Sequence, residues 1–133
     1  MKQLFQILTA GALIVAVGCQ HPDDAISGGG KGGNNTLSVT PEHADSLIST
    51  CKVYIKYGVL DAPANNLYDD SASPVMMNGV PKAIFHNLIR GNYYLYAQGT
   101  HVGYTPPGLK GGVPVTINST ADSLQVFLPT YSF

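Results

Sequence analysis

The chain has few side chains that could perform catalysis, and their spacing does not bring them together. Asp69 and Asp70 are adjacent, so an extended strand would point their carboxylates in opposite directions. The hydrolase motifs G-x-S-x-G and H-E-x-x-H are absent. The four histidines are too far apart in sequence for any two to have the spacing typical of zinc ligands on a helix. They are His21, His43, His86 and His101. We therefore expect neither a zinc site nor an enzyme.

An oxygen-rich stretch within residues 58–74 is the one candidate for a calcium site. It contains Asp61, Asn65, Asn66, Asp69 and Asp70. Calcium binds six to eight oxygens, but this spacing does not match an EF-hand loop. Aspartate and asparagine also form turns without any ion. Both interpretations are open, and the simpler one predicts no metal and no other cofactor.

A glycine-rich stretch, residues 27–35, contains a formal dinucleotide-binding pattern. Gly28, Gly30 and Gly33 satisfy G-x-G-x-x-G. That pattern binds a pyrophosphate only between a buried strand and the start of a helix, and the sequence predicts neither element here. The composition is typical of a flexible linker instead.

The first nineteen residues predict where the protein is located. Residues 4–17 form a mostly apolar run, too short for a membrane-spanning helix and typical of a secretory signal. The run ends in Ala16-Val17-Gly18-Cys19, which resembles a bacterial lipoprotein signal. The resemblance implies cleavage before Cys19 and acylation of its thiol. The alternative is an ordinary secretory signal with a chance cysteine.

The residues after the cysteine add a second resemblance. Asp23 and Asp24 are similar to the short acidic stretch that directs Bacteroidetes lipoproteins to the outer face of the membrane. With its leader, glycine-rich linker and one small domain, the chain resembles small Bacteroidetes surface lipoproteins. The resemblance implies an outer-membrane, lipid-anchored protein exposed at the cell surface. It also implies a protein partner there, for example a TonB-dependent uptake complex.

Composition favours short strands and turns. The chain has 133 residues, of which 11% are charged, and a net charge of −1, so no basic patch predicts nucleic-acid binding. It contains 15 glycines, 9 prolines and 8 tyrosines, a mixture that suits strands better than helices.

Cys51 alternates with Val53 and Ile55, which predicts a buried thiol; a catalytic thiolate would need a cationic setting.

Short alternating segments separated by turn residues begin near residue 36. The first alternating segment holds Leu37 and Val39, before Pro41. Further predicted strands cover residues 49–57, 75–77, 82–86, 92–98, 113–118 and 123–128, with a hairpin turn at Asn78-Gly79. The loops between them include 99–112 and 58–74, and the latter is either a long polar loop or a loop around a weak edge strand. This pattern predicts an all-β fold, a single antiparallel Greek-key β-sandwich of about seven strands. The expected organisation is a signal peptide at 1–18, a lipidated cysteine and linker at 19–35, and the sandwich at 36–133.

Residues 85–97 carry the most specific pattern of the domain. They resemble the F-x-x-L-x-x-G-x-Y-x-L-x-A pattern of prealbumin-like sandwich domains, which include the carboxypeptidase regulatory-like and Cna-B-like modules. The matching residues are Phe85, Leu88, Gly91, Tyr93, Leu95 and Ala97. The pattern predicts a turn at Gly91 and inward side chains at the other positions. The resemblance implies a non-catalytic module that binds or acts as a spacer.

The alternation of side chains along the predicted strands places several aromatic residues on the outer surface. If Tyr93, Leu95 and Ala97 point inward, then Tyr94 and Tyr96 point outward, and the same parity applies to Tyr54 and Phe127. Aromatic surfaces suit sugar rings and protein interfaces. Tyrosines are also common in strands without any such role, so both interpretations are open. The 99–112 loop, with Tyr104, is a second candidate surface.

These observations predict an outer-membrane-anchored, surface-exposed lipoprotein that acts as a non-catalytic accessory subunit of a larger surface complex. The alternative function is a stand-alone carbohydrate-binding module whose candidate face consists of Tyr54, Tyr94, Tyr96 and Phe127.

Overall fold

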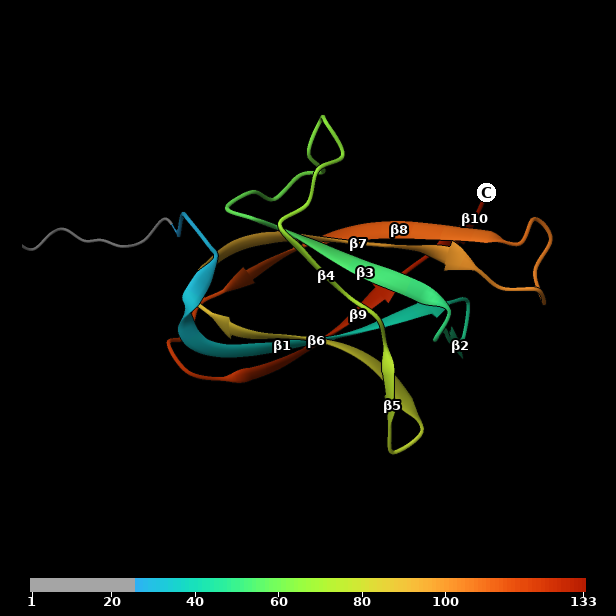
Figure 1. The fold of residues 1–133 in the computed structure, drawn as a ribbon, viewed down its shortest axis with the longest axis horizontal. Helices are drawn as coiled ribbons and strands as arrows, with labels where there is room; N and C mark the ends of the chain where they lie inside the picture. The colour runs from blue at the N-terminus through green and yellow to red at the C-terminus, as the bar shows by residue number, and fades with distance from the viewer. Residues whose placement is uncertain (1–25) are drawn as a thin grey trace, which may run out of the picture.

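The computed structural model describes residues 26–133, which fold into two β-sheets without any helix in that range (Figure 1). The predicted signal peptide, the predicted lipidation site Cys19 and the acidic pair Asp23 and Asp24 lie outside the described residues. No helix among residues 26–133 is long and apolar enough to cross a membrane. The all-β prediction is confirmed.

One sheet is built around the long strand β1 (Lys31–His43). This strand pairs antiparallel with β6 (Val80–Leu88) and, near its end, with β2 (Ser46–Leu47). Strand β5 (Val75–Met77) continues the sheet beyond β6. On the other side of β1, β9 (Ser123–Pro129) runs parallel to it. The wholly antiparallel prediction is therefore wrong for this pair, because alternation of side chains does not encode strand direction.

The second sheet is antiparallel throughout. Its order is β10-β8-β7-β3-β4, and its strands are β3 (Cys51–Tyr57), β4 (Asp70–Ala72), β7 (Gly91–Thr100), β8 (Gly108–Ile117) and β10 (Tyr131–Ser132). In Figure 1 the two sheets face each other as two layers, with β3, β7 and β8 in one and β1, β6 and β9 in the other. Strand β7 lies at the centre of its sheet, and side chains on its outer face therefore have neighbours on both sides.

Inward-facing side chains of both sheets form the core. The buried positions include Cys51, Val53 and Ile55 on β3, as their alternation predicts. The inward positions of the 85–97 pattern are also buried, none more than 2% exposed: Phe85, Leu88, Tyr93, Leu95 and Ala97. Burial raises the pKa of the Cys51 thiol, so it stays protonated and inert at neutral pH.

The loops are shorter than the sequence suggests. Asn78 and Gly79 both have positive φ, which confirms the predicted tight hairpin turn between β5 and β6. The 58–74 loop encloses the short edge strand β4, one of the alternatives left open. Strands β7 and β8 extend to Thr100 and from Gly108, so the predicted 99–112 loop contains only residues 101–107. Residues 26–133 form ten strands instead of about seven, because β2, β4 and β10 are too short for periodicity to reveal.

The glycine-rich stretch is packed against the domain from Gly28 onward. Strand β1 begins at Lys31, five residues before the predicted boundary. The backbone of Gly28 accepts a hydrogen bond from Asn92 N (2.7 Å), and Gly30 N donates one to the Tyr93 hydroxyl (2.9 Å). A Cβ on Gly29 would overlap the backbone of Asn92 and Gly58. These glycines therefore permit close backbone approach, a role that composition does not distinguish from flexibility.

Candidate functional site

The outer surface of the β3-β7-β8 sheet concentrates the aromatic side chains of the domain. We call this surface the aromatic face. Its members come from β3, the loop before β4, β7, β10 and the C-terminus: Tyr54, Tyr68, Tyr94, Tyr96, Tyr131 and Phe133. The strand members alternate with buried residues, because every second side chain of a strand points away from the core.

Three tyrosines of the aromatic face contact one another. Tyr54 and Tyr96 are direct cross-strand neighbours on β3 and β7, with ring centroids 6.2 Å apart. Tyr68 reaches over them from the loop, stacked on Tyr96 at 5.7 Å with an interplanar angle of 10°, and tilted against Tyr54 at 5.6 Å. All three side chains are only partly buried. The rings thus hold each other in place while leaving part of their surface open to solvent.

Tyr94 extends this surface toward β8. A Cβ on Gly112 would overlap the Tyr94 hydroxyl, so the Tyr94 ring lies across the position where Gly112 has no side chain. Tyr94 therefore lies along the sheet rather than projecting from it, and it widens the flat aromatic surface.

An open cavity of about 480 Å³ lies at the tyrosine cluster. It is lined by Tyr54, Asn66, Tyr68, Tyr96, Gln98 and Lys110. The lining combines aromatic rings with two amide side chains and one ammonium, which can donate and accept hydrogen bonds to a polar ligand. A second hollow shares Tyr54 and Tyr68 but adds Asp69 and Asp70. The two hollows give the aromatic face one basic end and one acidic end.

Burial raises the pKa of three tyrosines of this surface. Desolvation raises the pKa of Tyr68, Tyr94 and Tyr96 above its ordinary value, and neighbouring tyrosines or carboxylates add smaller increases. Their hydroxyls therefore act as neutral donors and acceptors at physiological pH. The Tyr96 hydroxyl donates to Gln98 Oε1 at 3.1 Å.

Three of the four predicted face residues lie together, and the fourth does not. Tyr54, Tyr94 and Tyr96 belong to the aromatic face. Phe127 lies on β9, opposite Thr40 of β1, and is therefore part of the other sheet. It is 53% exposed, so the prediction that it points outward is confirmed, but the expected common face is wrong. Alternation along a strand predicts which side of that strand a residue faces. It does not predict which of the two sheets the strand joins, because that depends on the tertiary fold.

The second candidate surface, the loop around Tyr104, is less open than expected. The Tyr104 ring packs edge-on against His43 at 4.4 Å and against His101 at 5.0 Å, and it contacts the core. Tyr104 therefore supports the end of the sandwich rather than offering a free ring.

The structure also adds members that the sequence did not indicate. Tyr68 lies in a loop, where parity gives no direction, and Tyr131 and Phe133 follow the last predicted strand. Lys110 Nζ lies 4.3 Å from the Phe133 ring centroid and 6.0 Å from that of Tyr131. The one signal available in the sequence was the aromatic-rich ending Tyr131-Ser132-Phe133.

The oxygen-rich loop uses its side chains for local structure. Asp69 Oδ2 accepts from Tyr57 N at 2.7 Å, and Asn65 Oδ1 accepts from Leu67 N at 3.1 Å. Asp70 Oδ1 accepts from Ser71 N at 2.8 Å. Within residues 26–133, no group of three or more His, Cys, Asp or Glu side chains is placed to hold a metal ion. These contacts favour the turn interpretation of the loop.

Comparisons with protein-family models and with curated proteins found no match. The geometry of the aromatic face is therefore the main guide to function.

Proposed function

We propose that the protein is a lipid-anchored, non-catalytic lipoprotein of the outer-membrane surface, and that its aromatic face binds carbohydrate. The observation that carries the proposal is the contact cluster of Tyr54, Tyr68 and Tyr96 beside an open cavity. Pre-packed rings offer apolar area to the C–H faces of sugars at low entropic cost. The amides of Asn66 and Gln98 suit sugar hydroxyls.

The location and the fold family belong to the same proposal. Acylation of Cys19 would anchor the chain, and Asp23 and Asp24 would direct it to the cell surface. A Greek-key sandwich of the prealbumin-like type is supported by the burial of the inward positions in the 85–97 pattern. Such modules serve as binding or spacer domains, which agrees with a surface protein that recognises a ligand without transforming it.

A glycan array tests the proposed binding. The full-length protein in detergent should bind a subset of glycans, and a Tyr54→Ala/Tyr96→Ala variant should lose at least about tenfold in affinity, roughly the effect of removing two stacking contacts. Phe127→Ala is the control, because it removes an exposed aromatic ring from the other sheet. Absence of binding by the wild-type protein, or equal losses in both variants, would refute the proposal.

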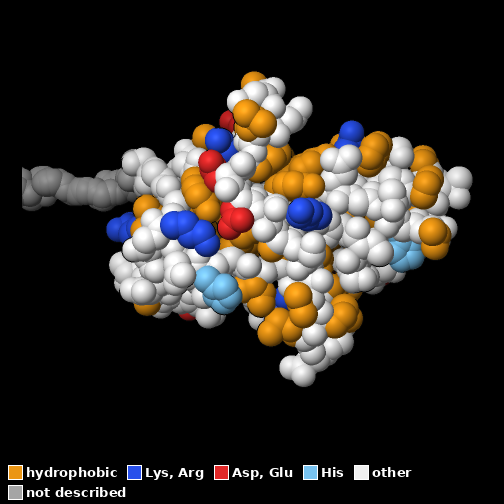
Figure 2. All heavy atoms as spheres, viewed as in Figure 1, with side chains coloured by type: hydrophobic (Ala, Val, Ile, Leu, Met, Phe, Trp, Pro, Cys, Tyr) orange, Lys and Arg blue, Asp and Glu red, His pale blue; other side chains and the backbone are white. Residues whose placement is uncertain are grey.

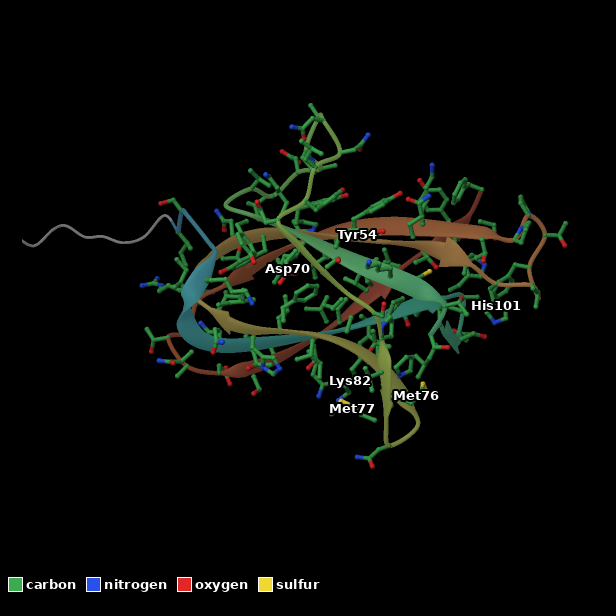
Figure 3. All side chains as sticks on the ribbon, viewed as in Figure 1. Tyr54, Asp70, Met76, Met77, Lys82 and His101 are labelled. Atoms are coloured by element: carbon green, nitrogen blue, oxygen red, sulfur yellow. The ribbon has the colours of Figure 1, made fainter. Side chains whose placement is uncertain are left out.

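A second candidate function, docking to a protein partner as an accessory subunit, is favoured by the β5–β6 hairpin. Val75, Met76 and Met77 are 62%, 57% and 44% exposed, and Figure 2 shows hydrophobic side chains gathered around this projecting hairpin. Consecutive exposed apolar residues are unusual on a soluble surface, and methionine is common at adaptable interfaces. Figure 3 places Met76 and Met77 away from Tyr54, so both functions can coexist.

Crosslinking in intact outer membranes tests the docking function. A specific partner, such as a component of a TonB-dependent uptake complex, should be recovered with the wild type and lost with Met76→Ser/Met77→Ser. Recovery of the same partner from both forms would argue against docking through this hairpin, and recovery of none would argue against the accessory function itself.

A further inference from the structure

The charged groups at the basic end of the aromatic face point to the chemical class of the carbohydrate. Lys52, Gln98 and Lys110 lie side by side on β3, β7 and β8, in one row across the sheet. The next row contains Tyr54 and Tyr96. Since neighbouring strands are about 4.8 Å apart, the two lysine backbones lie about 10 Å apart on either side of Gln98.

Within the described residues 26–133, neither lysine of this row forms an ion pair with a carboxylate. Among residues 26–133, ion pairs join Lys31 to Asp70 (3.8 Å) and Lys56 to Asp69 (3.6 Å), and neither pair includes Lys52 or Lys110. Asp69 and Asp70 are thus associated with other lysines, and no carboxylate of residues 26–133 lines the cavity that Lys110 lines. The row therefore presents uncompensated positive charge.

Aromatic rings hold both ammonium groups near the tyrosine cluster. Lys52 Nζ lies 6.0 Å from the centroid of the Tyr54 ring, and Lys110 Nζ lies 4.3 Å from that of Phe133. Figure 2 shows lysine or arginine side chains among hydrophobic ones over β3 and above β8. An anionic group on a sugar stacked at the cluster would therefore meet a positive charge on either side.

Resting on the proposed function, we infer that the ligand is an acidic oligosaccharide whose sugar rings carry a carboxylate. The ring stacks on the tyrosine cluster, and Lys52 and Lys110 bind the carboxylates of the oligosaccharide. Gln98, between the two lysines, can donate a hydrogen bond to the same groups. A chain of such sugars lies with its charges over the basic row, because the lysines near the other hollow, Lys31 and Lys56, are already paired with Asp70 and Asp69.

Calorimetric titration of the full-length protein with matched ligands tests the inference. The probes are oligomers of galacturonate, mannuronate or glucuronate, the methyl esters of those that bind, a neutral β-1,4-glucan oligomer and a sulfated galactan oligomer. Esterification removes the charge and keeps the ring, so the esters should bind at least about fivefold more weakly than the free acids, in line with the loss of exposed charge pairs. Added salt should weaken binding of the free acid and leave the ester unchanged.

Charge-removing variants provide the second measurement. Lys52→Gln and Lys110→Gln should each lower affinity for the acidic oligomer by roughly two- to fivefold. Lys82→Gln is the matched control, since Lys82 also lacks an ion pair in the described part of the chain but lies on β6 in the other sheet. Circular dichroism checks that all three variants are folded.

The outcomes separate this inference from the proposed function. Equal binding of acid and ester, preference for the neutral or sulfated oligomer, or equal effects of all three lysine variants would overturn the inference of a carboxylate-bearing ligand while leaving carbohydrate binding intact. Failure of every oligosaccharide to bind would refute both.

Discussion

The Tyr93 hydroxyl joins the glycine-rich segment to the β6–β7 turn. It accepts from Gly30 N (2.9 Å) and lies within donating distance of Ile89 O (2.6 Å) and Gly30 O (3.1 Å), while its ring is fully buried. Tyr93→Phe leaves Gly30 N without this partner. We expect the free energy of unfolding in urea to fall by about 1–3 kcal/mol. Tyr54→Phe, on the open face, is the control and should change it by less than about 0.5 kcal/mol; equal effects would contradict this role.

Ionisation of the tyrosines should also lower the stability of the fold at alkaline pH. Desolvation raises the folded-state pKa of Tyr68, Tyr93, Tyr94 and Tyr96 above 10.0. A raised pKa means that the fold favours the neutral phenol, so the stabilisation is complete below the unfolded-state pKa and is lost as the pH rises through the folded-state value. Urea midpoints should stay level from about pH 7 to about pH 9 and fall above about pH 10. A midpoint that rises with pH beyond that point would contradict the assigned direction.

At the scale of elements, the backbone of the glycine-rich segment packs closely against the start of β7, because the glycines there have no side chains. Gly91 has φ +158°, and a Cβ there would lie 2.5–2.7 Å from backbone atoms of Gly28 and Gly29. Gly91→Ala should destabilise the domain by about 2–6 kcal/mol, the sum of backbone strain and overpacking. Gly28→Ala meets open space and should lose only about 1–2 kcal/mol from its positive φ. Similar melting temperatures for the two variants would show that the segment is not packed here in solution.

These elements also show how far the sequence predicts the structure. Alternation around Val53 and Leu95 identified the buried faces, and Asn78-Gly79 identified the hairpin turn, because both are local signals. The parallel pairing of β1 with β9, the placement of Phe127 and the packing of Gly29 depend on contacts between distant segments. The site was only partly predictable for the same reason. Tyr68 stacks on Tyr96 because of the course of its loop, which local sequence patterns do not predict.

At the scale of the whole molecule, the predicted anchor and the packed glycine segment together limit the tether. If Cys19 is acylated, six residues separate it from Ile26, whose backbone oxygen already accepts a hydrogen bond from Asn92 Nδ2. A chain of that length spans at most about 25 Å. We expect intact-mass analysis of the native protein to give a chain that begins at an acylated Cys19. A chain starting elsewhere, or one without acyl mass, would exclude the anchor.

The most direct test of the account is the location of the bound ligand on the molecule. Backbone amide NMR shifts of the full-length protein in detergent, recorded with and without the oligosaccharide that binds best, report which strands the ligand contacts. Changes concentrated around Tyr54, Tyr68 and Tyr96 on the β3-β7-β8 sheet are the result we predict. Changes confined to β1, β6 and β9, or to the 101–107 loop, would contradict the assignment of the aromatic face as the binding site.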